Sequence, residues 1–308
     1  AAKRYLRLLP LVFVSVMLSY VLMQSGLYAF QNFTNASGYP ANTLVKAFGG
    51  PPEFLPAIKE ALYGALLNES AFNAPLWTIS LELFGSWFLF LLLAVTLQLR
   101  WRRFAWLAAV VVLACQGPTA QALLNFVLGL LLADFMVGNG RTLAMNDSRR
   151  MAWLALSLCI MVGTAAPGWL SLRWPTVEPA LGTVLDHVAA LGFVVCAALF
   201  TTVANGLSTR PLVWLGERSF ALYVIHAPVL ASLGQWSFVG ATKLGLGLEI
   251  SRGLAAVLTI VSSLAVADFL FKRVDRPGMD IANAFGRWLS QKQSAQGETT
   301  GDQPVTRV

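Results

Sequence analysis

The sequence predicts an all-α, polytopic membrane protein, a transmembrane bundle with about eight helices in this chain. Hydrophobic residues make up 56% of the chain and charged residues only 12%, and the mean hydropathy is +0.64. Soluble domains carry about 25% charged residues, so this chain lacks the polar surface that a water-facing protein needs. The apolar runs are continuous rather than alternating, which favours spanning helices over barrel strands.

Eight apolar segments approach the roughly 20 residues that cross a bilayer as a helix. In chain order they are 8–30, 76–99, 104–116, 121–137, 151–166, 183–204, 219–238 and 253–271. The segment 104–116 is short and fits a re-entrant or tilted piece as well as a crossing. We expect residues 1–288 to form the membrane domain, with 31–74 as a long Pro- and Gly-containing outer loop. Residues 289–308 are polar and aromatic-free, which predicts a disordered cytoplasmic tail.

The distribution of basic residues predicts the orientation. If the N-terminus is cytoplasmic, 17 of the 22 Lys and Arg residues fall in inner segments and 5 in outer loops. The positive-inside rule then places both ends in the cytoplasm, and we expect a bacterial inner (plasma) membrane. The net charge of +7 therefore indicates topology and contact with anionic lipids, not nucleic-acid binding. The three cysteines lie in apolar runs without metal-ligand spacing, so no metal site is expected.

Glu82 is a candidate functional residue because ionisable groups are costly inside a membrane. Counted from Pro75, it lies about 10 Å below the outer edge of the bilayer and therefore about 20 Å above the inner edge, the level of Arg4. Thr78, Glu82 and Gly85 follow helical spacing, so this polar stripe should face other helices or a cavity. Both a catalytic role and a structural hydrogen bond remain open for Glu82.

His226 is the second candidate. It shares a helix face with Ser219 and Tyr223, and it lies about 12 Å from the inner edge by helical rise. Pro228 lacks a backbone N–H, which frees the Val224 carbonyl and predicts a kink. A histidine on such a stripe can act as a base, because this side chain titrates near neutrality. The alternative is a neutral histidine held by one hydrogen bond.

Arg4, Arg7 and Pro10 form an Arg-x-x-Arg-x-x-Pro element before the first apolar segment. Two arginines three residues apart share a helix face and can grip phosphate bidentately. They equally fit a topology signal that contacts lipid headgroups. Four further ionisable residues lie near the ends of segments, where pairing or water can satisfy them; these are Asp134, Asp186, His187 and Asp268.

Four stretches of the chain, in order, resemble motifs of membrane-bound acyltransferase family 3. They are Arg4-Tyr-Leu-Arg-Leu-Leu-Pro10, Pro75-Leu-Trp-Thr-Ile-Ser-Leu-Glu82, Gly216-Glu-Arg-Ser-Phe-Ala-Leu-Tyr-Val-Ile-His-Ala-Pro228 and Val274-Asp-Arg-Pro277. The family usually has Glu where this chain has Asp275. The resemblance implies a core of ten helices, two of them before Arg4, so we expect the chain to lack that pair and the family's catalytic histidine with it. His187 and His226 are not its counterparts.

The resemblance also implies an activity. Members of the family transfer an acyl group, often acetyl, from cytoplasmic acyl-CoA to a hydroxyl, often of a saccharide or lipid-linked glycan beyond the membrane. No metal or redox cofactor is implied. Glu82 and His226 are then the expected catalytic residues. Those expected to bind substrate are Arg4, Arg7, Trp77, Ser80 and Tyr223.

Two other classes of function remain open from the sequence. A proton-coupled transporter would use Glu82 and His226 as a relay, although the chain shows neither an internal repeat nor paired broken helices. A structural or sensory membrane protein is the third possibility.

Overall fold

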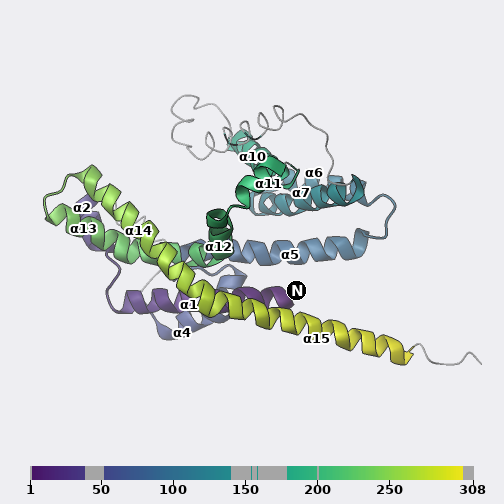
Figure 1. Ribbon diagram of the computed structural model, residues 1–308, viewed down its shortest axis with the longest axis horizontal. Coiled ribbons are helices and arrows are strands. Elements are labelled where there is room, and N and C mark those ends of the chain that lie inside the picture. Colours follow the sequence, from purple (N-terminus) through teal and green to yellow (C-terminus); the bar gives the residue numbers. More distant parts are fainter. Residues whose placement is uncertain are drawn as a thin grey trace, which may run out of the picture. The chain divides into compact units, whose positions relative to one another are not determined.

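The computed structural model describes residues 2–38, 52–139, 154, 158, 179–199 and 201–300, and these residues form helices joined by short turns, with no strand among them (Figure 1). This confirms the all-α class. The α-helices are α1 (Ala2–Gln24), α2 (Phe30–Ser37), α4 (Phe54–Lys59), α5 (Trp77–Thr96), α6 (Arg102–Ala114), α7 (Pro118–Asn139), α10 (Pro179–Leu199), α11 (Thr201–Leu207), α12 (Arg210–Val229), α13 (Gln235–Lys243), α14 (Leu248–Leu270) and α15 (Arg276–Thr300). Short π or 3-10 turns complete the chain at η1 (Glu60–Gly64), η2 (Ala65–Leu67), η3 (Ala74–Leu76), η4 (Leu230–Gly234) and η5 (Phe271–Asp275).

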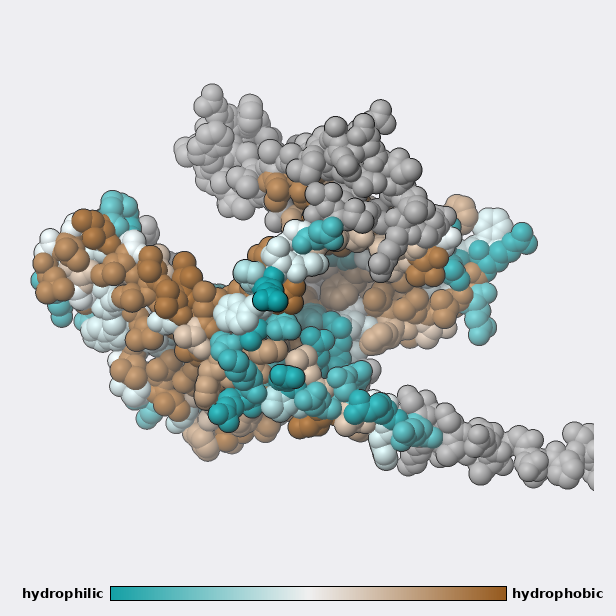
Figure 2. Space-filling view, viewed as in Figure 1, coloured by the Kyte–Doolittle hydropathy of each residue, from teal (hydrophilic) through white to brown (hydrophobic). Residues whose placement is uncertain are grey.

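Five helical stretches among the described residues are long and apolar enough to cross a membrane. They are Lys3–Gln24, Ala74–Thr96, Ala120–Gly138, Arg210–Lys243 and Leu248–Leu289. Their outward faces are apolar, as Figure 2 shows in brown over α14, where Val257, Ile260 and Val261 are each more than half exposed. Such surfaces are unfavourable in water and match a lipid environment. The protein is therefore an integral membrane protein.

The remaining three of the eight predicted segments differ in length or lie outside the described residues. Residues 104–116 fall in α6, which has only 13 residues and is too short to cross about 30 Å of hydrocarbon upright. The segment 183–204 divides between α10 and α11 and contributes a shorter apolar helix, His187–Ala198. The segment 151–166 lies outside the described residues apart from two positions.

The chain forms two compact units. Unit 1 comprises Ala1–Phe84 and Gly216–Val308, and unit 2 comprises Gly85–Leu215. Helices α5 and α12 each begin in one unit and end in the other.

Residues 52–76 of unit 1 are helical over most of their length, although the sequence predicts a loop there. The segment α4–η1–η2 packs on α1, and Ala57, Ala61 and Ala65 are fully buried. Their spacing of four residues places them on one helix face. Small side chains on that face let the backbone approach α1 closely, as in other membrane-embedded helix pairs. Whether this segment lies outside the membrane stays a prediction.

The later helices of unit 1 contain two π-helical turns. η4 begins two residues after Pro228, close to the point where the proline interrupts the helical hydrogen bonds. η5 joins α14 to α15, which packs along α1. α15 continues to Thr300, beyond residue 289 where the sequence predicts a disordered tail, and residues 301–308 lie outside the described part.

Two of the four ionisable residues near segment ends pair with basic residues, as the sequence predicted. Asp134 accepts from Arg102 at 2.8 Å and from Arg103 at 2.6 Å, which joins α6 to α7. Asp268 accepts from Arg218 and from Lys272, each at 2.6 Å. The side chain of Asp186 is not among those that the structure describes.

Candidate functional site

The candidate site lies in unit 1, where side chains from α1, α5 and α12 meet. Arg4 donates from Nη2 to Glu82 Oε1 at 2.7 Å. The two side chains are 35% and 42% exposed, so solvent screens the pair and its net contribution to stability is about 0.2–1 kcal/mol. Arg4 Nε is buried without a hydrogen-bond partner among the described residues. The guanidinium has five N–H donors, and because the side chain is 35% exposed, donors that Glu82 does not occupy can reach an anion.

This contact shows that the depth expected for Glu82 is wrong. A residue about 20 Å from the level of Arg4 cannot share an ion pair with it. The estimate assumed that residues 31–74 stand beyond the end of α1, but residues 52–76 run beside α1 instead. Tyr5 OH donates to Leu62 O at 2.9 Å, and Ser19 Oγ donates to Phe72 O. α5 therefore starts beside α1, and its second turn comes within reach of the Arg4 side chain.

Tyr223 connects α12 to the start of α5. Its hydroxyl donates to the Pro75 carbonyl oxygen and lies 2.5 Å from Thr78 Oγ1, so Thr78 is the donor in that second hydrogen bond. Thr78 and Glu82 thus both point at neighbouring helices, as the polar stripe predicted. Gly85, the next member of the stripe, lies in unit 2, where an added Cβ would overlap the Phe126 ring.

The orientation of His226 follows from its own helix. His226 Nδ1 lies 2.6 Å from the Tyr223 carbonyl oxygen. A carbonyl oxygen only accepts hydrogen bonds, so Nδ1 carries the proton, and in the neutral imidazole Nε2 is then the basic nitrogen. The ring also lies beside the Tyr223 ring, with centroids 5.8 Å apart. The backbone therefore fixes the tautomer that a general base requires.

Asn73 takes part in this arrangement and was missed by the sequence reasoning. Its Nδ2 donates at 2.7 Å to the Val224 carbonyl, the carbonyl that Pro228 was predicted to free. Asn73 is fully buried, so this bond replaces a helical one that the proline removes. The unpaired Val224 carbonyl was the available signal, but the sequence did not indicate which residue would reach it.

The other predicted substrate-binding residues do not join this cluster. Ser80 is buried and donates to the Trp77 carbonyl at 2.8 Å, so its hydroxyl is used inside the helix. Trp77 is 53% exposed. Arg7 is exposed, and its positive charge acts on Asp275. Asp275 is 4% exposed, and its Oδ1 has no hydrogen-bond partner among the described residues. Arg4 therefore contacts a carboxylate directly, whereas Arg7 acts on Asp275 through its charge.

Glu60 is a second buried group that the sequence did not single out. It is 2% exposed, and its carboxylate accepts from the backbone N–H groups of Ala71 and Phe72 at 2.9 and 3.1 Å. Burial raises the pKa of Glu60, and these backbone hydrogen bonds oppose the rise. Glu60 thereby holds the last residues of the 52–76 segment in place just before α5.

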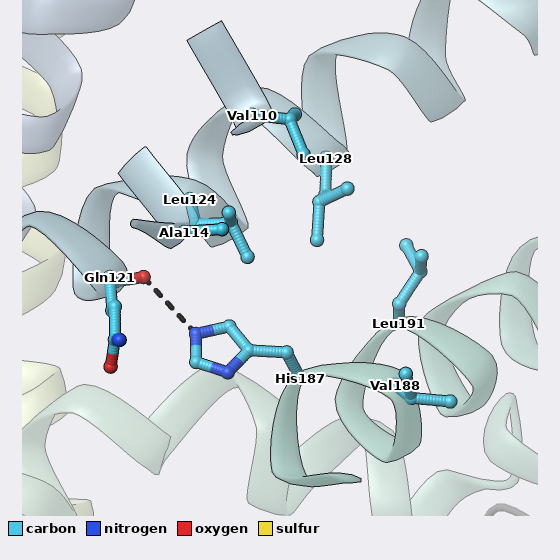
Figure 3. A pocket seen from close by; sticks show the side chains of 8 residues that line it. All are labelled: Val110, Ala114, Gln121, Leu124, Leu128, His187, Val188 and Leu191. Carbon is cyan, nitrogen blue, oxygen red and sulfur yellow. Dashed lines mark hydrogen bonds between the residues drawn. The ribbon is translucent and has the colours of Figure 1, made fainter. Parts of the chain in front are cut away.

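His187, the other histidine of the chain, lies in unit 2. Its Nε2 is 3.1 Å from the Gln121 carbonyl oxygen, which ties α10 to α7. The ring borders an otherwise apolar cavity of about 260 Å³ between α6, α7 and α10 (Figure 3). Val110, Leu128 and Leu191 line its far side. The residues that line this cavity with His187 include neither an acid nor a nucleophile.

Comparisons with known proteins agree on one chemical class. The family model described as "Acyltransferase domain" matches residues 1–272. The curated protein "O-acetyltransferase PaAT-1" of Phomopsis amygdali is 25% identical over 247 residues, which cover 70% of this chain and 48% of that protein. The chain thus spans about half the length of this relative. No solved structure matches the chain significantly.

Proposed function

The chain belongs to the acyltransferase family whose domain model it matches, membrane-bound acyltransferase family 3, and from this premise we propose that it is the membrane part of an O-acyltransferase. The proposed reaction moves an acyl group, acetyl in the first instance, from acyl-CoA to a hydroxyl group. The O-acetyltransferase name of the fungal relative supports both the acyl group and the oxygen acceptor. Family membership also argues against the transporter and the sensory protein.

Two sets of contacts in unit 1 carry the proposal. Arg4 pairs with Glu82 between α1 and α5, and Tyr223 joins α12 to the start of α5 and orients His226. Arg4, whose side chain is 35% exposed, binds the donor phosphates with the N–H groups that Glu82 does not occupy. Glu82 holds Arg4 against α5 and acts through it. Arg7, next to Asp275, extends the basic surface for the donor.

The acceptor hydroxyl transfers its proton to His226 Nε2 while its oxygen attacks the thioester carbonyl carbon. A tetrahedral intermediate with a negatively charged oxygen forms. The carbon–sulfur bond then breaks, and the CoA thiolate leaves with the proton that the imidazolium returns. Tyr223 positions the base, because its hydroxyl is fixed to α5 and its carbonyl fixes the imidazole.

The two histidines provide a matched test. In the protein expressed from its complete gene, His226→Gln should lower acetyl transfer at least 100-fold, the lower range for loss of general base catalysis. His187→Gln should leave transfer unchanged, because His187 lies in unit 2, where its Nε2 meets the Gln121 backbone carbonyl. Thermal unfolding of both variants checks that each still folds. Full activity of a stable His226→Gln variant removes His226 from the site.

We further propose that the donor is used from the cytoplasm and that the acceptor is a saccharide or another extracytoplasmic alcohol. The division of 17 against 5 basic residues supports this orientation. Cysteines placed at Gly50 and Met145 test it with a membrane-impermeant thiol reagent. The cysteine at 50 should react from outside and the one at 145 only after permeabilisation, and the reverse pattern would invert the topology.

A further inference from the structure

A second cavity of about 280 Å³ lies within unit 1, between α2, η4, α13 and α14. The residues that line it are Phe33, Ser37, Leu230, Gly234, Gln235, Phe238, Arg252, Ala255 and Ala256. These elements stand at the end of unit 1 that the basic-residue pattern predicts to be extracytoplasmic. The cavity shares no residue with the cluster around Arg4 and His226.

The walls of this cavity are mostly apolar. The Phe33 and Phe238 rings pack with centroids 5.1 Å apart, and Leu230, Ala255 and Ala256 supply further hydrocarbon. A water molecule occupies about 30 Å³ of the liquid, so the cavity holds a body of about ten non-hydrogen atoms. Its lining suits the apolar portion of a ligand, with few polar groups to orient it.

One of those polar groups is left without a partner. Gln235 is 4% exposed, and its Oε1 is buried with no hydrogen-bond partner among the described residues. A buried acceptor without a donor costs about 1–3 kcal/mol. An amide carbonyl can be satisfied only by an O–H or N–H donor. A ligand that donates a hydrogen bond to Gln235 Oε1 therefore removes the free-energy cost of leaving this buried oxygen unpaired.

The backbone next to Gln235 departs from the α-helix. η4 is a π-helical turn that ends at Gly234, and an added Cβ there would overlap Thr259 of α14. π-helical turns are frequent at functional sites, because the extra residue redirects side chains. Here the turn delivers Gln235 into the cavity wall directly after the helix is interrupted.

The charge at the cavity narrows the class of ligand. Arg252 lines it, with Nη1 paired to Glu249 at 2.6 Å. This cation disfavours an ammonium group as the donor to Gln235. A carboxylate suits Arg252 but offers Gln235 no proton. A neutral hydroxyl satisfies both conditions.

We propose that this cavity binds an amphipathic alcohol, with its apolar body between Phe33 and Phe238 and its hydroxyl donating to Gln235 Oε1. Binding of this class of molecule does not depend on the transfer reaction. That the bound alcohol is also an acyl acceptor rests on the proposed function.

The probe is 1-decanol carrying a diazirine on its alkyl chain, added to the purified protein expressed from its complete gene. After illumination, labels should map to peptides covering residues 230–256. Decanol should compete for labelling at least about tenfold better than decane, which lacks the hydroxyl. Gln235→Leu should weaken labelling about tenfold, whereas Gln121→Leu, in the apolar cavity of unit 2, should leave it unchanged.

Ala256→Leu fills the cavity without changing Gln235 and should abolish labelling. It tests the proposal even if Gln235→Leu does not fold. Equal competition by decane, or full labelling of either stable variant, would refute the proposal and leave the cavity as a lipid- or water-filled crevice. Labelling that persists in a protein without acyl transfer would refute only the proposed function.

Discussion

Replacing Arg4 should change protein stability and donor binding by different amounts, so the two possible roles of this residue can be separated. Arg4→Ala removes an ion pair whose partners are 35% and 42% exposed, so the free energy of unfolding should fall by no more than about 1 kcal/mol. If Arg4 also contacts a donor phosphate, the same change removes a charge-assisted hydrogen bond of about 1.5–3 kcal/mol. The apparent KM for acetyl-CoA should therefore rise about 10- to 150-fold. Initial rates against acetyl-CoA concentration, and thermal unfolding in the same membrane mimic, measure the two quantities.

Two controls make this test specific. Lys59→Ala removes a pair with Glu69 of similar exposure, 49% and 45%, and should lower stability by the same small amount without changing KM. Arg4→Lys keeps a charge for Glu82 but lacks the bidentate fork, so it should restore stability and rescue KM poorly. An unchanged KM in Arg4→Ala, or a loss of stability large enough to account for the whole effect, would show that Arg4 is a structural or topological residue.

Three further outcomes test the packing around the site. Asn73→Leu leaves the Val224 carbonyl unpaired in the interior, so the free energy of unfolding should fall by about 1–3 kcal/mol. Chemical denaturation measures this change, and an unchanged stability would show that the hydrogen bond does not stabilise the fold. Gly85→Ala usually stabilises a helix by about 1 kcal/mol, but the overlap with Phe126 should make it destabilising, which thermal unfolding will show by the sign of the change. Burial raises the pKa of Glu60, so the folded state binds this proton more tightly than the unfolded state. Its contribution to stability is complete below the unfolded pKa and is lost as pH rises through the folded pKa. The melting temperature should therefore rise as pH falls from neutrality toward the unfolded pKa, and Glu60→Gln should lose that slope.

The sequence predicted the helical class and the stripe on α5 because both depend on local spacing. The continuous apolar runs of α1 and α14 are visible in single segments, and so is the effect of Pro228 on the Val224 carbonyl. The contact between Arg4 and Glu82 could not be predicted in the same way. It depends on the path of residues 52–76, which is set by tertiary packing against α1 rather than by the composition of the segment.

The same distinction applies to the residues that sequence reasoning missed. Asn73 bonds to the backbone of Val224, far away in the chain, and Glu60 bonds to the backbone of Ala71 across a turn. Periodic patterns concern residues only a few positions apart, so they predict neither contact. Ser80 shows the reverse, because its position in a motif predicted substrate binding while its hydroxyl bonds to its own helix. Motif membership predicts the region of the site, and the hydrogen-bond geometry shows which of its side chains are bonded within the protein.

Two of the bonds that join α12 to the start of α5 run from a side chain to a backbone carbonyl, Tyr223 to Pro75 and Asn73 to Val224. Every residue offers the same carbonyl, so such a bond constrains only the residue that supplies the donor. Substitutions should be tolerated unequally across each pair: position 224 should accept other apolar side chains of similar volume, while positions 73 and 223 should each demand a donor of matching reach. Engineering of this protein can therefore vary side chains at positions that contribute only a backbone carbonyl, while Asn73 and Tyr223 are kept.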